Sequence, residues 1–175
     1  MWRDRHGLVA VEFALVLPIL LLLTLGVAEI GRFLLLDLKL QHAADTMADL
    51  VSRETTLNSA SLHRMFDAAQ YIVQPFDLTR RGVVIVSGVG VDNGSPPTVL
   101  WQESGAGSLA AASAIGSAGG RATLPADLIV RDEDTVIVAE ICFRYQGWLM
   151  RIIPDTVLRR AAFYRPRLGR LRSLG

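Results

Sequence analysis

One long apolar run near the N-terminus constrains this chain more than any other feature. Between Leu8 and Ala28 the only ionisable residue is Glu12, and residues 13–28 carry no charge at all. A helix of about 20 apolar residues is long enough to cross the hydrocarbon core of a bilayer. We therefore predict a transmembrane helix over residues 8–36, and the 175-residue chain leaves room for one modest folded domain after it.

Charge on the two flanks of the apolar run predicts how the helix is oriented. The segment before it, residues 1–7, is short and carries Arg3 and Arg5, whereas the flank after it is mixed and net acidic. Positively charged flanks stay in the cytoplasm. We expect a cytoplasmic N-terminus, a single pass through the membrane, and a C-terminal domain on the far side.

Composition and motif content argue against several classes of function. The formal net charge of +1 does not suit a nucleic-acid-binding polycation. The lone cysteine, Cys142, cannot form an internal disulfide, so it is either a buried apolar residue or paired between chains. The histidines lack metal-ligand spacing, and neither a phosphate loop nor a catalytic grouping is evident. We expect no enzyme activity, no cofactor or metal, and no small-molecule substrate.

Hydrophobic periodicity after the membrane segment predicts helix first and strand later. Apolar residues recur at spacings of three and four through residues 37–75, which indicates an amphipathic helical segment with a weak break near 55–59. Pro75 ends the second helix of that segment. Short runs rich in β-branched residues then predict four strands, at 82–91, 98–102, 135–145 and 156–164.

This order of elements predicts an α+β fold, with a small antiparallel sheet over residues 82–166 packed against helix. Gly, Ala and Ser dominate residues 104–120, which we expect to be a flexible loop with a short helical turn at 109–115. Apolar alternation over 135–145 predicts a half-buried strand. Residues 167–175 form a basic tail. Its arginines suit an anionic lipid surface or an acidic partner, or they only protect a solvated strand edge.

Glu12 is the most informative residue of the apolar run. A carboxylate inside a membrane helix costs about 2.5–3.5 kcal/mol on insertion scales, and such residues are functional by default. A partner for it arises if the chain is cut after Gly7, because Leu8 would then carry a new α-amine. Pairing of Glu12 in one chain with the Leu8 amine of a neighbour would fix the stagger between two subunits.

At these residues the sequence resembles the type IV prepilin family, and most closely the TadE-like minor pilins of the tight-adherence (Tad, or Flp) pilus system. The resemblance is carried by Gly7 before the cut, Glu12 at the fifth mature position, Phe13 after it, and the run Glu29-Ile-Gly-Arg32. It implies a pilin-like fold. It also implies that Gly7 and Leu8 form a processing site and that Glu12 and Phe13 act in subunit assembly.

The resemblance further implies a place and a set of partners. Residues 1–7 would be a leader peptide removed by a prepilin peptidase. The protein would reside in the bacterial inner membrane with its domain in the periplasm, in contact with membrane lipid. It would act as a minor pilin or assembly factor with other pilin-like subunits and Tad assembly proteins, and incorporation into the pilus itself stays open.

Alternatives remain at two places in the sequence. Glu29 and Arg32 are three residues apart and share a helix face, so they form either an ion pair at the outer membrane edge or a contact for a partner pilin. The chain as a whole is alternatively an unprocessed single-pass envelope protein whose outer domain binds a ligand or partner. An ordinary secretory signal cut near 26–28 is a further alternative.

Overall fold

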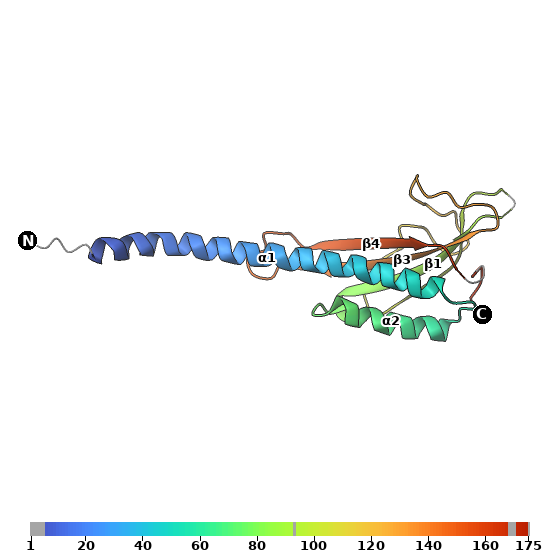
Figure 1. Cartoon of the computed structure of the whole chain (residues 1–175), viewed down its shortest axis with the longest axis horizontal. Coiled ribbons are helices and arrows are strands. Elements are labelled where there is room, and N and C mark those ends of the chain that lie inside the picture. The colour runs from blue at the N-terminus through green and yellow to red at the C-terminus, as the bar shows by residue number, and fades with distance from the viewer. Residues whose placement is uncertain (1–5, 93, 168–170, 175) are drawn as a thin grey trace, which may run out of the picture.

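The computed structural model describes residues 6–92, 94–167 and 171–174. Within them, a long helix projects from a domain that contains two shorter helices and a four-stranded sheet (Figure 1). The α+β class predicted from the sequence is confirmed. The elements are α1 (His6–Ser52), α2 (Ser59–Val73), α3 (Leu78–Arg81), β1 (Gly82–Gly90), β2 (Thr98–Gly105), β3 (Thr135–Tyr145) and β4 (Thr156–Tyr164).

The first half of α1 stands clear of the domain. α1 is one continuous helix of 47 residues that Pro18 does not interrupt. Its side chains from Val9 to Leu25 are apolar and exposed almost throughout, and by length and composition this helix could cross a membrane. The Thr24 hydroxyl donates to the Leu20 carbonyl at 2.8 Å, so this polar group is satisfied inside the helix. These properties are consistent with a single-pass membrane anchor.

The second half of α1 is amphipathic and packs on the sheet over β3 and β4, with α2 beside it (Figure 1). α2 begins with a capping box. The Asn58 side chain accepts from the Ser61 N–H at 2.8 Å, and the Ser61 hydroxyl oxygen accepts from the Asn58 N–H at 3.3 Å. The helix pair therefore supplies one continuous apolar surface. The buried residues of α1 recur at helical spacing: Leu36, Leu40, Ala43, Ala44, Met47, Ala48 and Val51.

The sheet has the strand order β2-β1-β3-β4, and all neighbours are antiparallel. Gly82 of β1 pairs with Phe143 of β3, and Tyr145 of β3 pairs with Thr156 of β4. The start of β1, the end of β3 and the start of β4 thus meet at one end of the sheet, the end nearer the free half of α1. The four strands were predicted, but β2 extends beyond residue 102 to Gly105.

Two local predictions were wrong. β3 is buried on both faces except at Arg144, whereas the sequence predicted a half-buried strand. The helices cover one face, and the segment after β2 covers the other, with Leu109 and Ile115 inserted against it. Residues 106–120 contain no helix or strand, as a loop does, but the segment lies against the sheet through Leu109 and Ile115, and no helical turn forms at 109–115. Short side chains allow this backbone to lie close to the sheet.

The chain end packs at the far end of the domain, away from the free half of α1 (Figure 1). The Trp101 indole donates to the Leu171 carbonyl at 2.7 Å, directly over Gly88, where a Cβ would lie 2.3 Å from the indole nitrogen. Arg167 bonds the end of α1, and Arg172 pairs with Asp92. The described part of the basic tail therefore bonds to its own domain.

Leu40 and Leu38 offer a matched test of this packing. Leu40 is fully buried and Leu38 is 69% exposed on the same helix. Leu40→Ala should lower the free energy of unfolding by about 2–5 kcal/mol, because it leaves a cavity between α1 and the sheet. Leu38→Ala should change it by less than about 0.5 kcal/mol. Denaturation of the full chain in detergent, followed by near-UV circular dichroism, measures both, and equal losses would contradict this packing.

Candidate functional site

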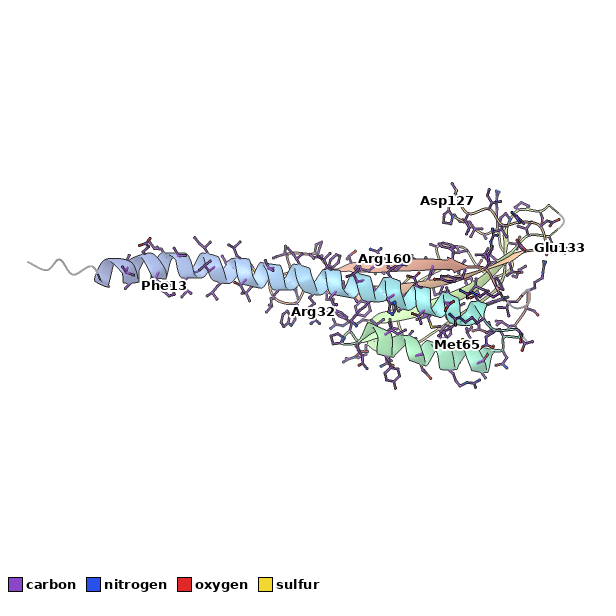
Figure 2. The ribbon with its side chains drawn as sticks, in the orientation of Figure 1. Phe13, Arg32, Met65, Asp127, Glu133 and Arg160 are labelled. Atoms are coloured by element: carbon purple, nitrogen blue, oxygen red, sulfur yellow. The ribbon has the colours of Figure 1, made fainter. Side chains whose placement is uncertain are left out.

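The predicted assembly residues lie on the free half of α1. Phe13 is 62% exposed near the start of the helix, and Figure 2 shows it far from the folded domain. Glu12 is exposed as well, and no other described residue donates to it or pairs with it. Gly7 and Leu8 belong to the helix, but residues 1–5 lie outside the described part of the chain, and the leader prediction falls largely there. Any partner of Glu12 must therefore come from outside these described residues.

The exposed apolar surface of α1 continues past the membrane span. Ile30, Leu34 and Leu38 recur at a spacing of four and are exposed, on the side of the helix away from the sheet. The segment predicted to be transmembrane, residues 8–36, is longer than the about 20 residues that the hydrocarbon core of a bilayer requires, and a span of that length beginning at Leu8 would end near Ala28. With a span of that length, the stripe would lie beyond the bilayer core, and in this structure nothing covers it among the described residues.

Glu29 and Arg32 do not pair with each other in this structure. The Glu29 carboxylate is fully buried, and its Oε2 accepts from the Met150 N–H at 2.8 Å. The Arg32 guanidinium lies over two aromatic rings instead, 5.1 Å from the centroid of Phe76 and 5.2 Å from that of Trp148. The predicted ion pair is replaced because the β3–β4 connection wraps against α1 and offers each side chain another partner.

We call the contact between α1 near Glu29 and Arg32, the end of β3 and the β3–β4 connection the junction. Tyr145, at the end of β3, belongs to it. The Tyr145 ring packs edge-on against Phe33 at 5.1 Å, and its hydroxyl is buried without a partner among the described residues, as is Oε1 of Glu29. Burial raises the pKa of the Tyr145 hydroxyl, the Glu29 carboxylate raises it further, and Arg32 partly offsets the rise. The phenol therefore stays neutral, and the junction joins α1 to the sheet through buried polar groups.

Two shallow hollows open beside the junction. One, of about 210 Å³, is lined by Arg32, Phe76, Tyr145 and the α3 arginines Arg80 and Arg81. The other, of about 310 Å³, shares those α3 arginines and adds Arg144. Neither holds a cluster of candidate metal ligands among the described residues. This end of the domain is therefore basic and aromatic.

The predicted assembly residues Glu12 and Phe13, together with Glu29 and Arg32, fall within a segment of α1 that matches a known protein family. Residues 7–49 match the family described as TadE-like protein. The N-terminal segment of this chain is TadE-like. The resemblance seen in the sequence is confirmed, and the match supports a protein associated with the Tad pilus and its components. No curated protein and no solved structure matches the chain.

The TadE-like segment begins at the glycine of the predicted cut and ends where α1 is packed on the sheet. It therefore contains the free half of the helix, the buried Glu29 and most of the helix face that enters the core. The sheet and its cover lie outside the matched residues.

A buried ion pair outside the TadE-like segment was missed by the sequence analysis. Glu140, fully buried on β3, pairs with Arg159 of β4 at 2.6 Å and accepts from the Ala114 N–H at 2.9 Å and from Ser113. Arg159 also donates to the Ala112 carbonyl at 2.7 Å. Through these bonds the ion pair holds residues 112–114 of the segment after β2 against the sheet. A glutamate in the middle of an apolar strand was the available signal.

Cys142 lies beside this pair, and it is free and fully buried. Burial raises the pKa of its thiol, Arg159 lowers it, and Glu140 raises it. The structure therefore places Cys142 as a packed core residue, without the exposure that a disulfide between chains needs.

Removing one member of the buried pair should destabilise the domain. Arg159→Leu leaves the Glu140 carboxylate buried and uncompensated, so we expect a loss of about 3 kcal/mol in the free energy of unfolding. Glu140→Gln with Arg159→Leu should recover much of that loss, because the buried charge is gone. Thermal unfolding of the unchanged chain, of Arg159→Leu, of Glu140→Gln and of the double variant gives the coupling energy, and additivity of the two single effects within about 0.5 kcal/mol would contradict the pairing.

Cys142 should react slowly while the chain is folded. Its raised pKa reduces the thiolate fraction at pH 8, and burial blocks access of the reagent. Iodoacetamide labelling followed by mass spectrometry should show little modification of the native chain and rapid modification in denaturant. Fast native labelling, or dimers that only a reductant separates, would contradict this placement.

Proposed function

We propose that this chain is a TadE-like minor pilin or assembly factor for the Tad/Flp pilus, with a structural and non-enzymatic role that needs no cofactor. α1 anchors it in the bacterial inner membrane, with the N-terminus cytoplasmic and the domain periplasmic. A prepilin peptidase cuts the chain after Gly7. The observation that carries this proposal is Glu12, an exposed carboxylate in an apolar helix with no partner among the described residues.

The cost of Glu12 in lipid supports a partner supplied by processing. An unpaired carboxylate in a membrane helix costs a few kcal/mol, about 2.5–3.5 on insertion scales. A cut after Gly7 gives Leu8 a positive α-amine at the same end of the helix. In a staggered pair of helices this amine lies beside Glu12 of the neighbouring chain. The charge pair then sets the stagger at which subunits assemble.

The apolar stripe of Ile30, Leu34 and Leu38 supports helix–helix packing beyond the bilayer. Exposed apolar patches of this kind mark interaction surfaces in soluble domains. A like helix from another pilin-like subunit would cover the stripe when subunits stack. The proposed partners are thus the peptidase, other pilin-like subunits, Tad assembly proteins and membrane lipid.

Processing gives the direct test of this function. We expect the full chain, extracted from cells that carry a prepilin peptidase, to begin at Leu8 in intact-mass and N-terminal sequencing measurements. In cells without the peptidase it should begin at Met1. A chain that begins at Met1 in both strains would favour an unprocessed envelope protein, and one cut near residues 26–28 would indicate a secretory signal.

Glu12→Ala separates processing from assembly. We expect this variant to be cut and inserted normally but to lose piliation, because the pairing that sets the stagger is gone. Asp127→Ala removes an exposed carboxylate at the far end of the domain and should leave piliation unchanged. Normal piliation in Glu12→Ala would contradict the assembly role.

A further inference from the structure

The connection between β3 and β4 is a turn with an unusual surface. Its residues Trp148, Leu149, Met150 and Ile152 are all exposed, and Trp148 is 58% exposed. Connections of this kind are normally polar because they face water, and a cluster of exposed apolar side chains marks an interaction site.

Three contacts fix where this connection lies along α1. The Cδ1 atom of Ile152 lies 3.4 Å from the position that a Cβ of residue 26 would occupy. The Met150 N–H donates to Glu29 at 2.8 Å, and Trp148 lies against Arg32. In Figure 1 the β3–β4 connection accordingly reaches back along α1 from the sheet.

That level is the outer boundary of the bilayer. A span of about 20 residues that begins at Leu8 ends near Ala28, which is between the contacts to residue 26 and Glu29. Tryptophan is enriched at this boundary, because its ring is apolar while its N–H can reach water. The exposed apolar residues of the connection therefore lie at the depth where lipid begins.

Arginines surround the same end of the domain. Arg32 comes from α1, Arg80 and Arg81 from α3, Arg144 from the end of β3, and Arg151 from the connection itself. None of the five forms an ion pair with a described residue. Guanidinium groups bind phosphate oxygens well, so this ring suits a surface of phosphate groups.

The opposite end of the domain is mixed in charge, because Arg121 and Arg131 lie there together with several carboxylates. Asp127 and Glu133 lie there, at the tip farthest from the free half of α1 (Figure 2). Asp132 and Asp134 flank Glu133 in the sequence. The end that carries the five arginines is thus the more basic of the two, and a basic surface that faces the bilayer is complementary to an anionic lipid surface.

We propose that the end of the domain formed by residues 146–153 and α3 is a second membrane contact. The side chains of Trp148, Leu149 and Ile152 enter the headgroup and upper acyl region of the periplasmic leaflet. The surrounding arginines bind the phosphate groups of anionic phospholipids. This contact adds to the anchoring by α1 and holds the domain on the bilayer until assembly removes it.

The proposal rests on the membrane-anchoring part of the proposed function and is independent of the pilus role. A chain that begins at Met1 in every strain would overturn the processing and leave this contact intact. A domain that stands free of lipid would overturn this contact and leave the processing intact.

An environment-sensitive probe measures the depth of the connection. Full-length chain carrying Leu149→Cys is labelled with an NBD fluorophore, while the buried Cys142 stays unlabelled. The matched control is Ile129→Cys, which replaces an exposed apolar residue at the far end. Both are reconstituted in vesicles of phosphatidylcholine with phosphatidylglycerol, with and without a quencher on the acyl chains. We expect blue-shifted, strongly quenched emission at 149 and aqueous, unquenched emission at 129. Aqueous emission at both positions would overturn the proposal.

The arginines are tested through the same probe. An arginine near an anionic surface contributes about fivefold to the association. Arg80→Gln with Arg81→Gln should therefore lower the ratio of docked to free probe at 149 by about 25-fold in the anionic vesicles. Arg121→Gln with Arg131→Gln, two exposed arginines at the other end, should not change it. Equal effects of the two pairs would overturn the role of the α3 arginines, and near-UV circular dichroism verifies that each variant is folded.

Discussion

The structure depends on one helix, α1, whose two halves have different surroundings: lipid for the first half, as proposed, and the core of the domain for the second. In the bilayer every backbone polar group must bond within the segment, so the first half of α1 must be helical and apolar on all sides. Beyond the bilayer the same helix needs only one apolar face, and that face enters the core through Leu36, Leu40 and Met47. Because the helix does not end between the two regions, the orientation of the membrane segment and that of the sheet are determined together.

The change of surroundings occurs at Glu29, and its carboxylate shows how the change is accommodated. A buried charge without a partner is costly, and here a backbone N–H from the β3–β4 connection donates to it. The same connection places Trp148 against Arg32, so the contacts that tie α1 to the sheet also leave apolar side chains exposed beside the free half of α1. Anchoring, domain orientation and the proposed lipid contact therefore share one set of residues.

Local patterns in the sequence were enough to predict α1, the four strands and the antiparallel α+β arrangement, because each of these depends on side-chain period and turn residues. The partners of buried charges were not predictable in the same way. Glu29 bonds to Met150, and Glu140 bonds to Ser113, Ala114 and Arg159. Such distant pairings leave no local pattern. The second buried face of β3 was missed for a related reason, since a cover of small residues resembles a loop in sequence.

The rigid continuity of α1 from membrane to domain is the central claim, and a distance measurement across the boundary tests it most directly. Spin labels at Leu20→Cys, within the membrane half, and Ile129→Cys, at the far end of the domain, are placed in the full chain in lipid nanodiscs. Double electron–electron resonance should give one narrow distance distribution, because α1 is unbroken between the two regions and Glu29 is held by the domain. A broad distribution with several maxima would show a hinge at the membrane boundary and contradict the account.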